Sequence, residues 1–79
     1  MTWNESGGVL RTQLTFADFA EAFAFMTRVG LVAQEQGHHP DLSISWNRVN
    51  ISLTTHDAGN TVTENDRKLA ATIDAMRAS

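Results

Sequence analysis

The chain of 79 residues contains 42% hydrophobic residues, no cysteine and a formal net charge of −3. This composition predicts one globular domain over residues 1–79, without disulfides or thiolate metal sites. Because the six Lys and Arg residues are scattered, we expect no direct binding to nucleic acid, which normally requires a clustered basic face. The lack of a signal-like segment and of an apolar run that could span a bilayer indicates a cytoplasmic protein with no membrane partner.

The first predicted element is a β-hairpin near the N-terminus. Residues 9–14 alternate between apolar and polar side chains, which is the pattern of a strand with one buried face. Trp3 is assigned to a short preceding strand, and Gly7-Gly8 supplies the turn between the two strands.

The next predicted element is a long helix. It is expected to begin at Thr15, because Thr15 and Asp18 resemble a capping box, and to end at Gly37 as its C-cap. The apolar stripe expected to face the sheet consists of Phe16, Phe19, Ala20, Phe23, Met26, Gly30 and Ala33. A second apolar row consists of Phe25, Val29 and Val32. One sheet surface does not easily cover both rows, so we expect a further contact with another element or a second subunit.

A second hairpin and a C-terminal helix follow. Residues 41–46 and 49–56 both alternate, and Asn47-Arg48 is the predicted turn between them. Thr63 and Asp66 resemble another capping box, and the helix after it has an apolar face of Leu69, Ala70, Ile73 and Met76. The order ββαββα predicts an α+β fold, in which an antiparallel sheet of about four strands carries the helices on one face.

All three histidines lie around the second hairpin. His38 and His39 precede its first strand and His56 ends its second strand, so the three rings are predicted at one end of the sheet. Spacing alone leaves three interpretations open. The imidazoles can act as general acid and base near neutral pH, bind a divalent metal, or be loop-end residues without a chemical role.

Asp66 also has two interpretations. It can orient a histidine as a carboxylate partner, or it can cap the C-terminal helix together with Thr63. The spacing of three residues from Thr63 favours the cap.

Four segments around these residues follow an ordered pattern. They are Gly37-His38-His39-Pro40-Asp41, the aromatic Trp46, Leu53-Thr54-Thr55-His56-Asp57-Ala58-Gly59, and Asp66-Arg67-Lys68-Leu69-Ala70. Their combination resembles the signature of the pterin-4a-carbinolamine dehydratases. The similarity runs from about Trp3 to Ile73, which is nearly the whole chain.

The resemblance implies an enzyme that dehydrates 4a-hydroxytetrahydropterins to quinonoid dihydropterins and so recycles the pterin cofactor of aromatic amino-acid hydroxylases. The family uses no metal and no bound cofactor. Its catalytic positions match His38, His39, His56 and Asp66. Its other substrate-binding positions match Gly37, Thr54, Thr55 and Asp57. We expect His38 and His56 to transfer protons while His39 holds the pterin.

The chain departs from the family pattern in four places. We expect it to lack the helix that precedes the first strand in relatives and so to be a short form of the family. Gln34 stands where an acidic residue is frequent, and Trp46 stands where tyrosine is frequent. The segment between His56 and Asp66 is one residue longer than is common.

Two further expectations concern assembly and function. The small core, the two apolar rows and the tetrameric relatives favour a homo-oligomer, either a dimer or a tetramer. The alternative to a dehydratase is a non-catalytic pterin-binding or dimerisation protein, or a transcriptional cofactor, on the same fold.

Overall fold

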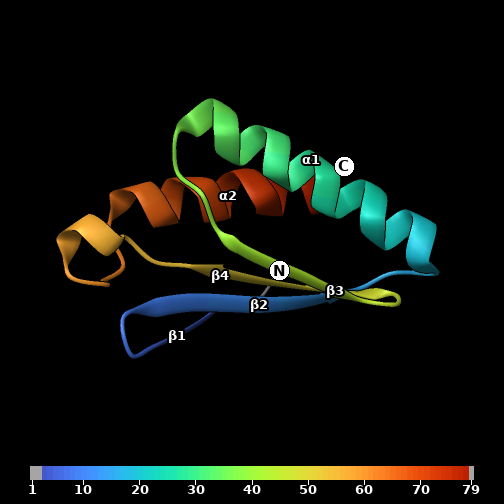
Figure 1. The fold of residues 1–79 in the computed structure, drawn as a ribbon, viewed down its shortest axis with the longest axis horizontal. Coiled ribbons are helices and arrows are strands. Elements are labelled where there is room, and N and C mark those ends of the chain that lie inside the picture. Colours follow the sequence, from blue (N-terminus) through green and yellow to red (C-terminus); the bar gives the residue numbers. More distant parts are fainter. Residues whose placement is uncertain (1–2, 79) are drawn as a thin grey trace.

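The computed structural model describes residues 3–78. Its elements are β1 (Asn4–Ser6), β2 (Val9–Thr15), α1 (Phe19–Gln36), β3 (Asp41–Ser45), β4 (Arg48–Leu53), the 3-10 helix η1 (His56–Ala58) and α2 (Glu64–Ala78). The four strands form one antiparallel sheet in the order β1-β2-β4-β3, and both helices cover the same face of it (Figure 1). The predicted α+β class and ββαββα order are therefore confirmed. No helix within residues 3–78 is long and apolar enough to cross a membrane.

The second hairpin determines which end of the sheet holds the candidate site. In the β3–β4 pair, Asp41 lies opposite Ser52 and Ser45 lies opposite Arg48. The segment just before β3 and the segment just after β4 are therefore neighbours at one end of the sheet, as the sequence predicted.

Two boundaries of this hairpin differ from the prediction. The turn is formed by Trp46 and Asn47, because Arg48 already pairs with Ser45 as a strand residue. β4 ends at Leu53, before the predicted His56. Past Leu53 the chain leaves the sheet, and Thr55 forms an isolated bridge with Thr61 instead.

The predicted start of α1 at Thr15 is wrong. Thr15 is the last residue of β2 and pairs with Arg48. Phe16 is held to the neighbouring turn, since its amide donates to the Asn47 carbonyl and its carbonyl accepts from Asn47 Nδ2. The true N-cap is Asp18, whose side chain accepts a hydrogen bond from the Glu21 amide.

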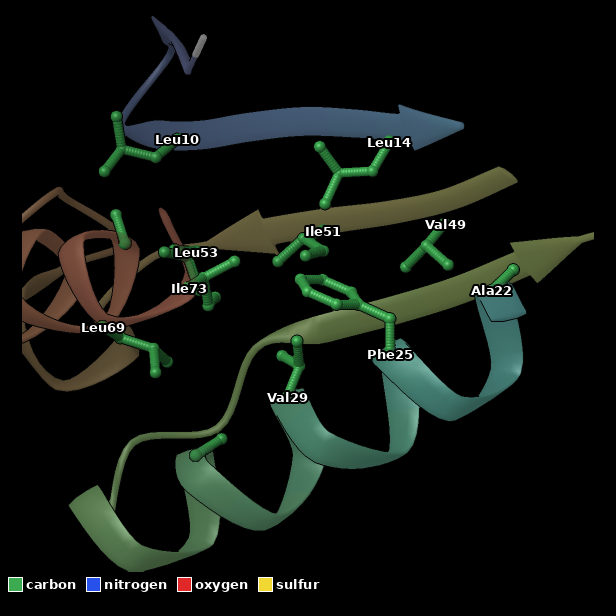
Figure 2. Close-up of a cluster of buried hydrophobic side chains, with 12 residues drawn as sticks. Leu10, Leu14, Ala22, Phe25, Val29, Val49, Ile51, Leu53, Leu69 and Ile73 are labelled. Carbon is green, nitrogen blue, oxygen red and sulfur yellow. The ribbon is translucent and has the colours of Figure 1, made fainter. Parts of the chain in front are cut away.

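The predicted face of α1 is only partly correct. From the predicted stripe, Ala33 is buried, and Phe16 and Met26 pack against the core while partly buried. The buried residues of this helix are Ala22, Phe25, Val29 and Ala33, and Figure 2 shows three of them, Ala22, Phe25 and Val29, on the side of the helix that faces Val49 and Ile51 of β4. Phe19 and Phe23, from the stripe expected to face the sheet, are 48% and 49% exposed. Periodicity could not choose between the faces, because apolar side chains occupy more than one side of α1.

The predicted face of α2 is confirmed. Leu69, Ala70 and Ile73 are buried in the core, and Met76 packs against it while partly buried. Full burial of a side chain such as Leu or Ile contributes about 1.5–3 kcal/mol relative to exposure. The N-terminal segment is also tied to α2, because Trp3 Nε1 donates to Asp74 Oδ1 at 2.8 Å.

The β1–β2 turn packs against the segment that follows η1. Gly8 has φ +78, and a Cβ atom placed on it would lie 2.2 Å from the backbone oxygen of Asn60. The Gly8 carbonyl also accepts a 2.8 Å hydrogen bond from Thr54 Oγ1. Only glycine allows this approach, so the N-terminal hairpin supports the loop that carries Asn60.

We predict that Gly8→Ala destabilises the fold much more than Gly7→Ala. Both glycines have positive φ. Alanine is strained in this left-handed region, so each substitution should lower the unfolding free energy by about 1–2 kcal/mol. A Cβ at Gly7 meets nothing within 4 Å, whereas a Cβ at Gly8 requires the Asn60 backbone to move. Urea unfolding of the two variants measures the difference, and equal losses of unfolding free energy would contradict the contact.

Candidate active site

The C-terminus of α1 directs His38 and His39 toward the end of the sheet. Gly37 adopts the left-handed conformation, with φ 67 and ψ 26, and its amide bonds the carbonyls of Ala33 and Gln34. The His38 amide also donates to the Ala33 carbonyl, at 3.1 Å. This predicted glycine cap stops the helix and turns the chain immediately before the two histidines.

His38 points inward and pairs with a buried carboxylate. Its Nε2 lies 2.5 Å from Asp66 Oδ1, and the two side chains are 14% and 0% exposed. A carboxylate accepts hydrogen bonds, so the ring nitrogen is the donor. His38 Nε2 is therefore committed to Asp66, and Nδ1 is its free nitrogen.

Asp66 is both the helix cap and the histidine partner that the sequence offered as alternatives. While Oδ1 accepts from His38, Oδ2 accepts from the Thr63 amide at 2.8 Å and from Thr55 Oγ1 at 2.7 Å. The hydroxyls of Thr55 and Thr63 are 2.6 Å apart. Because Thr55 donates its proton to Asp66, Thr63 is the donor within the threonine pair.

These contacts keep Asp66 ionised. Burial acts to raise the pKa of Asp66, but hydrogen bonds from His38, the Thr63 amide and Thr55, together with the charge of His38, hold the pKa below its usual range. A negative charge is thus fixed directly behind His38.

His39 and His56 have neutral amide partners. His39 Nε2 lies 2.7 Å from Gln34 Oε1, in the last turns of α1. His56 begins η1, and its Nδ1 lies 2.7 Å from Asn60 Oδ1. An amide oxygen also only accepts, so each ring donates from that nitrogen and keeps the other one free.

The three histidines line one pocket with a volume of about 190 Å³. Its lining consists of Gly37, His38, His39, Thr55, His56 and Asp57. Of the other predicted site residues, Asp66 lies behind His38, and the Thr54 hydroxyl is bonded to the Gly8 carbonyl. The structure therefore brings the expected rings together at the end of the hairpin.

A larger hollow of about 370 Å³ lies between α1 and α2. Its apolar surface comes mainly from Phe16, Phe25 and Met76, and its charged groups are Glu21, Arg28 and Arg77. It contains no group that titrates near neutral pH, so the smaller histidine pocket is the better candidate for proton chemistry. Within residues 3–78, no three His, Cys, Asp or Glu side chains are grouped so that they could hold a metal ion.

The sequence does not predict the partners of two histidines, which are Gln34 for His39 and Asn60 for His56. Gln34 stands out in the sequence only as a departure from the family pattern, and Asn60 belongs to the segment between His56 and Asp66. The available signal was weak. An amide four to five residues from a histidine is within reach when the intervening chain turns, but many exposed amides satisfy that condition without making such a contact.

Comparison with known proteins shows the family of the chain. A family profile described as "Pterin 4 alpha carbinolamine dehydratase" matches residues 1–76. The chain belongs to this family. Its dehydratase relatives include proteins of Synechococcus sp. (strain WH7803) and Paraburkholderia xenovorans, both named provisionally as pterin-4-alpha-carbinolamine dehydratases. The first is 50% identical and covers 94% of this chain and 78% of the relative; the second is 49% identical and covers 96% and 80%.

Two solved structures share the dehydratase fold. A transcriptional coactivator/pterin dehydratase from Brucella melitensis superposes with a TM-score of 0.84 at 36% identity, covering 92% of this chain and 79% of the other. A pterin dehydratase-like protein described as a RuBisCO assembly factor in the alpha-carboxysome has a TM-score of 0.79 at 28% identity, covering 95% and 88%.

The depressed pKa of Asp66 predicts a loss of stability in acid. A carboxyl whose pKa is lower in the folded state than its unfolded value of about 3.9 stabilises the fold above that value. This contribution is lost as the pH falls through the folded pKa. Asp66→Asn should weaken the acid dependence between about pH 5 and pH 2, and should lower the unfolding free energy at pH 7 by about 1.5–3 kcal/mol.

Urea unfolding across this pH range measures both effects. Asp57→Asn is the matched control, because Asp57 is exposed and none of the three hydrogen bonds described at Asp66 involves it. An Asp66→Asn variant with the acid dependence of the wild type would contradict the assignment.

Proposed function

We propose that this protein dehydrates 4a-hydroxytetrahydropterins to quinonoid dihydropterins, as part of pterin cofactor recycling. The observation that carries the proposal is the grouping of three imidazoles around one pocket, with an ionised carboxylate behind one of them. Membership of the dehydratase family supports the pterin as substrate.

The reaction requires two proton transfers. The bond between carbon 4a and its hydroxyl oxygen breaks, and that oxygen takes a proton so that it leaves as water. The ring gives up a proton to a base, and the products are water and the quinonoid dihydropterin. No electrons enter or leave, so the chemistry itself needs no redox cofactor. Positioned acid and base groups typically accelerate such steps about 10²–10⁴-fold.

The hydrogen bonds leave one reactive nitrogen on each of the two histidines proposed to transfer protons. His38 donates from Nε2 to Asp66, so only Nδ1 is left to exchange a proton with the substrate. His56 donates from Nδ1 to Asn60, which leaves Nε2. Each ring is thus held as a defined tautomer before the substrate binds.

The charges of the hydrogen-bond partners indicate which histidine donates a proton and which accepts one. Asp66 is anionic and compensates the positive charge of a doubly protonated His38, so we assign His38 as the proton donor to the leaving oxygen. His56 has a neutral partner and accepts the ring proton. His39, anchored to Gln34 at the rim, holds the pterin.

The remaining pocket residues contact or frame the substrate. Gly37, Thr55 and Asp57 line the pocket beside the rings, and we assign them to pterin binding. The Thr54 hydroxyl is bonded to Gly8, so Thr54 contributes by holding the pocket wall or through its backbone. The pocket volume of about 190 Å³ is below the roughly 300–1,000 Å³ usual for sites that take drug-sized ligands.

We further propose a homo-oligomer built on the outer face of α1. Phe19 and Phe23 are about half exposed and stack on each other, with ring centroids 5.7 Å apart and an interplanar angle of 13°. Leu31, on the same helix, is 65% exposed. Large aromatic side chains are enriched in the centres of protein interfaces.

The alternative is a protein-binding role without catalysis. It is motivated by the name of the RuBisCO assembly factor that shares this fold and by the coactivator function in the name of the Brucella protein. A scaffold has no need for three rings held around one pocket, which favours the dehydratase. A rate assay with 4a-hydroxypterin decides between the two.

We predict that His38→Ala and His56→Ala each lower kcat for dehydration by about 10²–10⁴-fold, because each removes one proton-transfer group. Stopped-flow dehydration of enzymatically generated 4a-hydroxytetrahydropterin measures this loss, and circular dichroism checks the fold. Lys68→Ala, an exposed change on α2, is the control and should keep the wild-type rate. Near-normal rates in both folded histidine variants would refute the assignment.

We predict that Phe23→Asp reduces the solution mass to that of one chain, because a charge buried in an apolar interface is costly without a partner. Light scattering at micromolar concentration measures the mass. Ala71→Asp places the same charge on an exposed position of α2 and should leave the assembly intact. A wild-type protein that is already monomeric would overturn the proposal.

A further inference from the structure

We infer that Asn60 is a positioning residue for the proton acceptor, holding His56 as the Nδ1–H tautomer so that Nε2 is free in the pocket. This inference rests on the proposed function for its consequence on rate, but its structural part is independent of the substrate. Neither the helices nor the strands contain Asn60, which lies in the loop between η1 and α2.

The contact itself defines the tautomer. His56 Nδ1 and Asn60 Oδ1 are 2.7 Å apart, a normal distance for a direct hydrogen bond. The amide oxygen has no proton to give, so the ring must donate. In the neutral ring, a proton on Nδ1 leaves Nε2 with a lone pair, which is the state that a general base needs.

The backbone of Asn60 is fixed from three directions. Its amide donates to the Thr55 carbonyl at 3.1 Å, and the next residue, Thr61, bridges back to Thr55. On the outer side, its carbonyl lies against Gly8, where there is no room for a Cβ. The constrained loop therefore holds the side-chain amide of Asn60 next to His56, although the side chains of Asn60 and His56 are both exposed.

The conformation of Asn60 separates positioning from folding. Its φ is +58, one of two positive values among the non-glycine residues of the described chain, and asparagine tolerates this region better than most residues. Glycine adopts such a φ without strain. Replacing Asn60 by glycine should therefore remove the amide without weakening the backbone.

The two proposed proton-transfer rings differ in the charge of their hydrogen-bond partners. His38 is backed by an anionic carboxylate and His56 by an uncharged amide, each at a normal or short hydrogen-bond distance. The amide fixes the orientation of His56 without adding a charge to those that already line the pocket, the Asp57 carboxylate and the ionisable rings of His38 and His39. A carboxylate at the same place would keep the orientation but favour the protonated, non-basic ring.

The test compares Asn60→Gly with Asn60→Asp. Asn60→Gly should keep or raise the unfolding free energy and lower kcat about threefold to tenfold, the range expected for one net hydrogen bond, with little change in KM. Asn60→Asp should retain the His56 tautomer and shift the acid limb of the kcat–pH profile to higher pH. Asn4→Asp adds the same charge on β1 and should leave that limb in place.

Long-range proton–nitrogen NMR spectra of the imidazole rings provide a readout that needs no substrate. We expect neutral His56 to show a protonated Nδ1 and a bare Nε2 in the wild type, and a mixture of tautomers in Asn60→Gly. A wild-type His56 protonated on Nε2, or an Asn60→Gly variant with an unchanged tautomer and unchanged kcat, would overturn the inference. A wild type that shows the expected tautomer but no dehydration would instead overturn the proposed function alone.

Discussion

The buried Asp66 carboxylate joins three segments that fold from separate parts of the sequence. It accepts from the Thr63 amide at the start of α2, from the Thr55 hydroxyl after β4, and from His38 after α1. A buried carboxylate without such partners would be too costly to keep ionised. The same hydrogen bonds that offset this cost also orient the histidine, so the stability of this end of the sheet and the geometry of the pocket depend on one group.

Much of the fold follows from local patterns. The alternation in β2 and β4 predicts which residues face the helices, and Leu10, Leu14, Val49, Ile51 and Leu53 are indeed buried. Gly37 was recognisable as a cap because few other residues adopt its conformation. The start and buried face of α1 were not predictable, because Thr15 and Asp18 are both residue types that cap helices and apolar residues occupy several sides of the helix. The contact of Phe16 with Asn47, 31 residues away, decides where the helix begins.

Strand pairing alone predicts the three histidines of the candidate site, and the family resemblance adds Asp66 and the pocket residues Gly37, Thr55 and Asp57. Hairpin geometry brings His56 to His38 and His39, and this needs only the pairing of two alternating segments. The partners behind the rings depend on how short polar loops close. Asn60 reaches His56 only because Thr55 pairs with Thr61 and Gly8 packs against the loop from another hairpin. Such contacts have no periodic signature, so the sequence alone does not distinguish among the several polar residues that could partner each histidine.

The distance along α1 between its Asp18 cap and Gly37 has a consequence for how such proteins can vary. The helix turns about 100° and rises 1.5 Å with each residue. One inserted residue would leave the packing of Phe25 near the N-terminal end of α1 in place. It would rotate Gly37 and the following His38 about the helix axis, so that His38 no longer faces Asp66. Substitutions at exposed positions of α1 other than Gln34, which is bonded to His39, are compatible with the pocket, whereas changes in the length of α1 are not.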